Sequence, residues 1–544
     1  MCNERSAMET ILSSDDLKVV SDLQMVASNG LDTTSYRPPT FRYLVPKSSK
    51  YTLVLERTSI MSANGRWKNV RRAFYRFLNY VPAGAEVSIV TFGKEAALNL
   101  PPTVVTDANR EGLHGRIPRK VLADDLACVF CALNMSLGTL GDDPGTVILV
   151  TGSPREAQNM DRLIEKISGT PVRVFPIAYP GTAHPSLVGL ARHGRHYAVG
   201  EDGSPLNYLT EVLLDVLRKS GSLNIQKVHE TRHLSYEFAG TFTLDESTLD
   251  GVSVTLNVDD EDKVEFFEIT NPSGKKHLFS KFEDGMVVFE HRGAAEAGIW
   301  TYHSKLYPTA GLPAERMTVD VVSHGGGSPK GESSPVMLDV FTNADGVEVD
   351  LYQQPIIIYA RLTHGDSLPV LGARVVVRIM RPGNNSHSDD VVELTMRDDG
   401  AGDPDVTGDD GLYSVHFSDF ASVPGFYGVQ VVAGHNDGLA RTAGWAAQAG
   451  EAAEGCCGSR VRFRETIPAA PFHRQAAGPG FYVRQGLSPR ADVAPPSRIF
   501  DFRLARAIEA SLYVQLEWSS PGGDYDQGKG KSAYFAVSFN SFSN

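Results

Sequence analysis

The segment Tyr51–Ser62, YTLVLERTSIMS, constrains the fold more than any other part of the chain. Its apolar run predicts a buried β-strand, and the polar residues that follow predict a loop at the carboxyl end of that strand. A loop reading D-x-S-x-S at this place can hold a hard cation, because one carboxylate and two hydroxyls supply oxygen ligands. Here Glu56, Thr58 and Ile60 occupy those positions. Ile60 offers no side-chain oxygen and Glu56 is one methylene longer than Asp, so the sequence keeps the strand and damages the metal motif.

The length and charge of the chain limit its architecture and its partners. A chain of 544 residues is expected to hold several domains, because single hydrophobic cores stop growing at roughly 250–300 residues. The net charge of −13 argues against a nucleic acid or an anionic membrane surface as partner and favours cations or basic protein surfaces. The sequence shows no run long enough to span a bilayer and no signal-peptide pattern at its start. Since the opening MCNERSAMETIL reads like the middle of a protein, we expect a fragment.

Residues 51–220 alternate between predicted strands and predicted helices. Short apolar runs predict further strands at Val87–Phe92, Val147–Val150 and Val172–Ala178. Such alternation is typical of a parallel sheet with helices on both faces. Ligands bind such sheets at the carboxyl ends of the strands, so residues 52–62 and 147–154 form the expected binding rim. The strand and loop at Tyr51 resemble the opening of a von Willebrand factor A-type domain.

Beyond Gly221 the apolar residues alternate with a period of two. This pattern, at Val252–Val258 and again at Ala373–Ile379, predicts half-buried strands in two antiparallel sandwiches joined near residue 330. After Gly438 the chain is rich in Ala, Gly and Arg, which predicts a linker. From Ala494 the sequence resembles the first strands of a fibronectin type III module.

The predicted fold class is therefore multidomain, with an α/β von Willebrand factor A-type domain, antiparallel β-sandwiches and a partial fibronectin type III-like module. The expected divisions are a connector from a missing N-terminal module at 1–48, the A-type domain at 49–220, a β-sandwich at 221–328, a second β-sandwich at 329–438, a linker at 439–493 and the partial module at 494–544.

Several short segments, taken in order, resemble the calcium-activated chloride channel regulator family. They are CNERS, PPTF, the A-type strand and loop, GIWTY, PVLGARV, DDGAGD, GLYS, PPSRI and SSPGGDYDQGK, and they extend over nearly the whole chain. Members of that family begin with a secretory signal and a zinc metalloprotease module that bears H-E-x-x-H. The resemblance implies that this chain starts where that module ends, so it implies no catalysis and a location outside the cell or at its surface. It also implies binding to an anoctamin-type chloride channel through a metal in the A-type domain.

The sequence His229-Glu-Thr-Arg-His233 spells H-E-x-x-H by itself. Zinc binding by this motif requires a helix that brings both histidines to one face. The flanking residues instead alternate as in a strand, where the two histidines would lie ~13 Å apart at ~3.3 Å per residue. We expect a chance match with no zinc and no peptidase activity.

Completing an A-type metal site needs ligands from two further loops, as the resemblance implies. Asp125 falls near the position of the second-loop Thr, and Gly152 stands where an Asp is expected. With Ile60 and Gly152 at lost ligand positions, Glu56, Thr58 and Asp125 remain as a degenerate site. We favour a metal-free protein-binding rim, and a distorted carboxylate site with oxygen ligands stays open as the alternative.

The acidic loop DDGAGDPDVTGDDGLYS holds a second candidate cation site. Asp403, Asp405 and Asp409 are spaced like ligands of a calcium loop, but the twelfth position is Ser414 rather than a bidentate Glu. A solvated turn is the alternative. Calcium is the one cofactor that the sequence leaves open.

The cysteines and sequons allow two smaller predictions. Cys128 and Cys131 form C-x-x-C on a predicted helix at Asp124–Leu137, and without a second pair at zinc-ribbon spacing we expect buried thiols. Asn384 begins an N-x-S sequon in a polar turn, and we expect glycosylation there if the chain is exported.

Two functions follow from these observations. The first is a non-enzymatic extracellular regulator of calcium-activated chloride conductance, which binds an anoctamin-type channel through its A-type domain. The second is a cell-adhesion or matrix-interaction protein that uses the same rim and sandwiches to bind another cell-surface protein. Neither involves nucleic acid or a transmembrane segment of this chain.

Overall fold

A computed structural model describes most of the chain from residue 50 to residue 525. Residues outside the description are 1–49, 155–158, 180–182, 192–193, 201–204, 221–224, 246–250, 259–260, 280–285, 294, 308–315, 325–334, 346, 352–354, 366–367, 383–390, 444–458, 462, 464, 488–493, 500–501, 509–512, 519, 521 and 526–544. The chain divides into the units Met1–Pro46 and Lys47–Asn544, and all described residues lie in the second. The expected connector at 1–48 thus lies outside the described residues.

The first domain is an α/β unit built on a six-stranded sheet in the order β3-β2-β1-β4-β5-β6. Its strands pair in parallel except for β3, which runs antiparallel to β2 at the edge. The strands are β1 (Lys50–Glu56), β2 (Glu86–Phe92), β3 (Ala96–Val104), β4 (Thr146–Thr151), β5 (Arg173–Ala178) and β6 (Tyr197–Ala198). The predicted α/β domain is confirmed, and we call Lys50–Ser220 the A-type domain.

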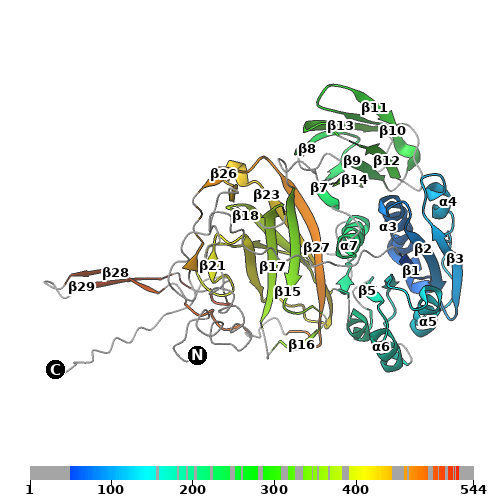
Figure 1. Cartoon of the computed structure of the whole chain (residues 1–544), viewed down its shortest axis with the longest axis horizontal. Coiled ribbons are helices and arrows are strands. Elements are labelled where there is room, and N and C mark those ends of the chain that lie inside the picture. Colours follow the sequence, from blue (N-terminus) through cyan, green and yellow to red (C-terminus); the bar gives the residue numbers. More distant parts are fainter. Residues whose placement is uncertain are drawn as a thin grey trace, which may run out of the picture. The chain divides into compact units, whose positions relative to one another are not determined.

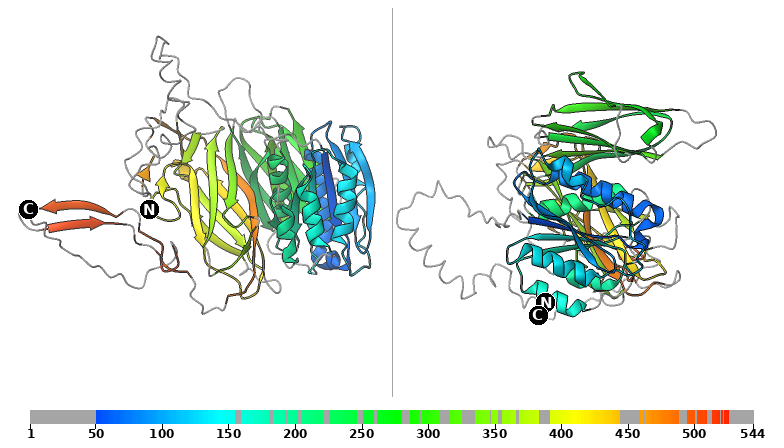
Figure 2. Two further views of the ribbon diagram at one scale, coloured as in Figure 1. Left: turned by 60° about the horizontal axis from the view of Figure 1, so that its bottom comes forward. Right: turned by 90° about the vertical axis from the view of Figure 1, so that its right-hand side faces the viewer.

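Helices cover both faces of this sheet (Figure 2). Near-continuous apolar strands such as β4 are buried on both sides, and each face therefore has its own apolar core. The helices are α3 (Arg66–Tyr80), α4 (Arg110–His114), α5 (Val129–Leu140), α6 (Met160–Ser168) and α7 (Pro205–Lys219), with 3-10 turns at Ser59–Gly65 and Pro185–Ala191. None of the helices described is long and apolar enough to cross a membrane.

Two β-sandwiches follow the A-type domain. In the first, the sheet β11-β10-β13-β8 packs against β12-β9-β14-β7 around one apolar core. Its strands are β7 (Ile225–Leu234), β8 (Glu237–Leu244), β9 (Gly251–Val258), β10 (Val264–Thr270), β11 (Lys276–Phe279), β12 (Met286–Arg292), β13 (Gly298–Leu306) and β14 (Arg316–His324), with a 3-10 turn at Glu261–Lys263. The half-buried strand predicted at Val252–Val258 is instead buried throughout as β9, where Asn257 contacts Asn207 of the A-type domain at 3.1 Å, whereas β13 shows alternating burial.

The second sandwich has its own core between two layers of strands (Figure 1). Its strands are β15 (Val336–Thr342), β16 (Glu348–Val349), β17 (Ile356–His364), β18 (Leu368–Leu371), β19 (Arg374–Met380), β20 (Val391–Met396), β21 (Thr407–Gly408), β22 (Leu412–Phe417), β23 (Gly425–Gly434), β24 (Arg441–Ala443), β25 (Ser459–Arg460), β26 (Thr466–Pro468) and β27 (His473–Val483), with a 3-10 turn at Asn436–Gly438.

The two sandwiches share one nine-stranded sheet. Strand β7 of the first pairs with β27 of the second through a single register pair, Lys227 with Gln475, so that β12-β9-β14-β7 continues into β27-β23-β19-β20. The sequence predicts two consecutive sandwiches joined near residue 330 and does not indicate a shared sheet. The difference arises because β27 has one edge paired with β23 and the other edge open to β7.

The predicted linker at 439–493 is wrong for much of its length, because it contains β27, a buried strand of eleven residues. The sequence Gly478-Pro-Gly480 reads like a turn, but the glycines are there for close packing. A Cβ at Gly478 would lie 2.5 Å from Val340 Cγ1, and one at Gly480 would lie 2.8 Å from the Tyr427 carbonyl oxygen. The Gly480 N–H also donates to the carbonyl of His196, at 2.9 Å, so β27 contacts the A-type domain.

The last described elements are a two-stranded antiparallel ribbon of β28 (Arg503–Ile508) and β29 (Tyr513–Glu517). A ribbon of two strands does not close a fibronectin-like sandwich, which needs about seven strands. The partial module that the sequence predicts is described only as far as this ribbon, and residues 526–544 lie beyond it.

A buried cluster of charges joins the three domains. Lys227 of β7 forms ion pairs with Glu211 of α7, with Glu230 of β7 and, at 3.1 Å, with Asp320 of β14. Asp320 also pairs with Arg76 of α3. Burial by itself lowers the pKa of Lys227 but the three carboxylates outweigh it, so the pKa is raised and the ammonium stays charged.

Lys227→Met is expected to lower the free energy of unfolding by about 3–5 kcal/mol, because it leaves three buried carboxylates with one cation fewer. Urea denaturation monitored by fluorescence measures the loss. Lys276→Met is the matched control, since Lys276 is an exposed lysine whose pair with Glu268 contributes at most about 1 kcal/mol. Equal effects of the two substitutions would contradict the central role of the cluster.

Candidate functional site at the rim of the A-type domain

The candidate site lies where β1 and β4 end side by side. Parallel pairing aligns Leu55 with Val150, so the next residues, Glu56 and Thr151, are neighbours at the carboxyl edge of the sheet. The loops 57–65, 123–128 and 152–154 surround this edge, and with Glu56 and Thr151 we call them the A-type rim. The rim therefore lies where the sequence predicts it, at the carboxyl ends of the parallel strands.

The Glu56 carboxylate is buried and is satisfied by the chain itself. Its Oε1 accepts a hydrogen bond from the Thr58 hydroxyl. Its Oε2 accepts one from the Thr151 hydroxyl at 2.5 Å, one from the Gly152 N–H at 2.9 Å and one from the Ser153 N–H at 3.2 Å. Donors aimed at an ionised carboxylate stabilise its charge. Hydroxyls and backbone amides thus take up the lone pairs that a cation would use.

The positions expected to have lost their metal ligands have other roles. Ile60 packs its side chain against the apolar core, and its carbonyl accepts a hydrogen bond from Arg66 Nη1 at 2.6 Å. Gly152 contributes its N–H to Glu56 in place of a side-chain oxygen. Both residues therefore support the rim as structure rather than as ligands.

Asp125 is not brought to Glu56 by any hydrogen bond. It is exposed and accepts a hydrogen bond from the Ser59 hydroxyl. The Ser59 N–H donates to the Asp124 carbonyl at 2.8 Å, so these contacts fix the second loop of the rim to the first. Within the described residues, no group of three or more His, Cys, Asp or Glu is placed to hold a metal ion. Glu56, Thr58 and Asp125 are thus held by contacts within the chain, and the metal-free rim stays a prediction.

Sequence reasoning did not identify Thr151 and Ser153 as partners of Glu56. The signal was available in part, because Thr151 ends an apolar strand that the sequence places beside β1. The Ser153 contribution comes from its backbone N–H, which side-chain identity does not reveal.

Glu56→Ala is expected to destabilise the protein by about 2–4 kcal/mol, because buried hydroxyls and N–H groups lose their acceptor. Addition of millimolar Mg²⁺ is expected to leave the melting temperature of the unsubstituted protein unchanged. A cation at a hundred times its dissociation constant would add ~2.7 kcal/mol, so thermal melting detects it. A clear upward shift that Glu56→Ala abolishes would show that the site binds metal.

The expectation of buried thiols at Cys128 and Cys131 is wrong, because the structure joins them in a disulfide. The predicted helix also begins later, since α5 starts at Val129 with Cys128 as its N-cap. The Cys128 N–H donates to the Gly93 carbonyl at 2.8 Å. Residues 124–128 are therefore an anchored loop of the rim.

The H-E-x-x-H sequence lies on strand β7, as its flanking residues predict. Glu230 is an ion-pair partner of Lys227, and this charge, opposing the effect of burial, lowers its pKa to about 2. Strand spacing implies histidines ~13 Å apart, but their rings lie closer together than this. Nε2 of His229 and Nε2 of His233 lie 3.4 and 3.1 Å from the same Tyr302 hydroxyl. The absence of zinc there stays a prediction.

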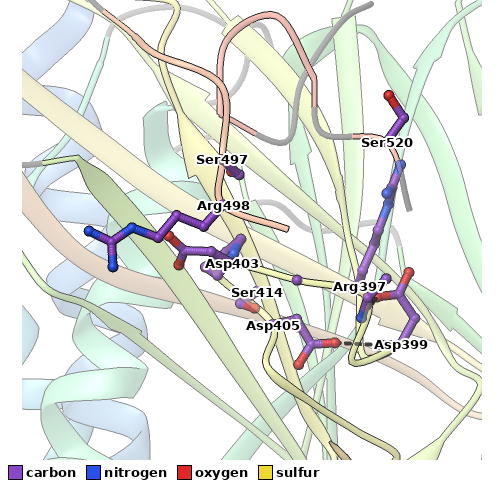
Figure 3. Close-up of a pocket in the computed structure, with 11 residues that line it drawn as sticks. Arg397, Asp399, Asp403, Asp405, Ser414, Ser497, Arg498 and Ser520 are labelled. Carbon is purple, nitrogen blue, oxygen red and sulfur yellow. Dashed lines mark hydrogen bonds between the residues drawn. The ribbon is translucent and has the colours of Figure 1, made fainter. Parts of the chain in front are cut away.

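The acidic loop uses its carboxylates to hold its own backbone. Asp405 accepts hydrogen bonds from the N–H groups of Asp399 and Gly400, and Asp409 pairs with Arg460 at 3.2 Å. Asp403 and Asp405 line one small pocket, where a dashed line marks the bond from Asp405 to Asp399 (Figure 3). The three carboxylates proposed as calcium ligands thus have separate partners or surroundings, and calcium binding stays a prediction.

Asp398 carries the strongest electrostatic signal of this loop. Its carboxylate accepts hydrogen bonds from the N–H groups of Asp410 and Gly411, at 3.1 and 3.0 Å. Burial and then the charge of Asp410 raise the pKa of Asp398 to about 7. An acid whose folded-state pKa is raised destabilises the fold as it ionises. The penalty is absent near pH 4, grows as the pH rises and is complete above about pH 7.

Asp410→Asn is expected to raise the melting temperature at pH 8 and to have little effect at pH 4, because it removes the repulsion felt by ionised Asp398. An Asn at this position keeps an oxygen for the Leu412 N–H. Thermal melting at both pH values measures the difference. Asp142→Asn removes an exposed charge and is the control. An equal shift at both pH values would contradict the coupling to Asp398.

The sequon at Asn384 lies outside the described residues, so glycosylation there stays a prediction.

Curated proteins similar to this chain share one name. Calcium-activated chloride channel regulator 1 of Bos taurus is 27% identical over 578 residues, covering 99% of this chain and 59% of the relative. Calcium-activated chloride channel regulator 2 of Mus musculus is 25% identical over 559 residues, covering 97% of this chain and 56% of the relative. The chain is a homologue of the calcium-activated chloride channel regulators. It spans a little under three-fifths of the length of these regulators.

Other comparisons add the following. No protein-family model matches the chain. Among solved structures, a von Willebrand factor type A protein from Catenulispora acidiphila aligns with a TM-score of 0.28 and 12% identity, covering 52% of this chain and 63% of that structure. Proximal thread matrix protein 1 from the mussel byssus, with a zinc-occupied MIDAS motif, aligns with a TM-score of 0.27 and 15% identity, covering 33% of this chain and 47% of that structure.

Proposed function

We propose that this homologue of the chloride channel regulators is a non-enzymatic regulator of calcium-activated chloride conductance. It acts outside the cell, by protein–protein binding through its A-type rim. The likeness to regulators over 97% or more of the chain supports the class of function. The proposed partner is an anoctamin-type chloride channel.

The observation that carries this mechanism is the internal satisfaction of Glu56 by Thr58, Thr151 and two backbone N–H groups. A partner cannot reach a buried carboxylate whose lone pairs are already used. Binding then falls to the exposed part of the rim, at 62–65, Asp125, Leu126 and Pro154. Leu126, 47% exposed, is the apolar residue of this surface and is the one whose substitution tests the contact. The rim therefore binds without a bridging metal.

The same observation favours a second function. In the resembled family the A-type domain contacts the channel through its metal, so a rim that does not fit a metal weakens that contact. Adhesion to another cell-surface or matrix protein requires only the exposed rim and the sandwiches.

The whole chain, applied outside cells that display a calcium-activated chloride channel, is expected to raise the chloride current by stabilising channel at the surface. Whole-cell recording measures the current, and chelation of external divalent ions is expected to leave the effect unchanged. Leu126→Asp is expected to abolish most of the increase, because it places a charge on the rim. Leu278→Asp is the matched control, since Leu278 is 66% exposed on β11 and lies outside the rim.

A strong increase that chelation removes would overturn the metal-free mechanism while supporting the regulator function. No increase, together with no binding to the external loops of the channel, would favour adhesion.

A further inference from the structure

The two sandwiches enclose a cavity of about 460 Å³ that the proposed function does not use. Strands β7 and β27 pair only through Lys227 and Gln475, and beyond this pair they diverge. His473 Nδ1 contacts the Val228 carbonyl at 3.1 Å across the gap. The cavity opens between the β7–β8 side of the first sandwich and strands β19, β20, β23 and β27 of the second.

The floor of this cavity is apolar. Its accessible apolar lining is Val376, Val432 and Pro471, since Phe242 and Phe472 are each 3% exposed and belong to the cores of the two sandwiches. Its volume falls within the range of roughly 300–1,000 Å³ that is typical of small-molecule sites. The floor therefore accepts an apolar group of moderate size.

The edge of the cavity carries two charges of opposite sign. Arg374 begins β19, and Asp437 lies in the turn that follows β23. Strand pairing places Arg374 opposite Gly434, three residues before Asp437. In the described part of the chain neither side chain has a hydrogen-bond or ion-pair partner, whereas the nearby Arg378 and Glu393 pair with each other at 2.7 Å. Arg374 and Asp437 thus remain available to a ligand.

His473 adds a hydrogen-bond acceptor. A carbonyl can only accept, so the proton on His473 lies on Nδ1 and the other ring nitrogen carries a lone pair. Burial lowers the pKa of His473 to about 4, and the ring is neutral at physiological pH. A neutral imidazole with a free lone pair can accept a hydrogen bond from an ammonium group.

We propose that this cavity binds a zwitterionic amino acid with an apolar side chain. Arg374 pairs with the carboxylate, which the planar guanidinium can hold through two parallel hydrogen bonds. Asp437 and His473 receive the ammonium group, and Val376, Val432 and Pro471 contact the side chain. A simple anion would meet the charge of Asp437, and a simple amine would meet that of Arg374. The site uses none of the rim residues, so it stands or fails separately from channel regulation.

The whole chain titrated with L-phenylalanine tests the proposal by isothermal calorimetry or ligand-observed NMR. Phenylpropanoate lacks the ammonium group and phenylethylamine lacks the carboxylate. Each is expected to bind at least about tenfold more weakly than L-phenylalanine, since one charge-assisted contact is lost. Arg374→Gln and Asp437→Asn are each expected to weaken L-phenylalanine binding by a similar factor.

Arg484→Gln is the matched control. Arg484 is exposed and follows the end of β27 opposite to His473, so its substitution is expected to leave binding unchanged. Melting temperatures of all variants establish that they are folded. No saturable binding of L-phenylalanine up to roughly 10 mM would overturn the proposal. Equal affinity for the three probes would also overturn it, because the floor alone would then account for binding. The probe comparison uses the unsubstituted chain, so it decides the matter even where a variant fails to fold.

Discussion

The arrangement of the three domains depends on the Lys227 ammonium. It is buried among carboxylates from a helix of the A-type domain and from two strands of the first sandwich. Glu211 in turn accepts hydrogen bonds from Gln430 and Gln475 of the second sandwich, at 2.7 and 2.8 Å. Charges buried this deeply are tolerable only when every partner is in place. The domains therefore specify one another's positions at a single point, in addition to the apolar contacts between them.

This cluster also explains why a protease-like sequence occurs on a strand. Glu230 follows Lys227 by three residues and pairs with it, and His229 and His233 contact Tyr302 of the facing sheet. A lysine, a glutamate and two histidines in this order each have a structural role in local packing or charge. Short motifs recur by chance when each residue has its own structural reason.

Apolar periodicity predicts four strands of the A-type sheet, β1, β2, β4 and β5, and some strands of the sandwiches, because burial of one or both faces fixes which residues are apolar. It does not predict β27, where Gly478 and Gly480 are required by Val340 and Tyr427, residues far away in sequence. At the rim the sequence predicts that Ile60 and Gly152 no longer provide side-chain oxygens. It does not predict that backbone N–H groups replace the cation, since any residue except proline carries that group. What sequence reasoning misses in both places is contact between segments that are distant along the chain.

The position of β27 near the end of the chain has a consequence for how the protein is made. Strand β7 ends at Leu234, but the strand that covers its open edge ends only at Val483. At ribosomal speeds of about 5–20 residues per second, roughly 10–50 s separate the two. In the last part of that interval, after β23 ends at Gly434, β23 presents unpaired N–H and C=O groups, which readily pair with other chains, whereas β7 gains only the Lys227–Gln475 pair from β27. Shielding of this edge during synthesis is therefore a requirement separate from the stability of the finished fold.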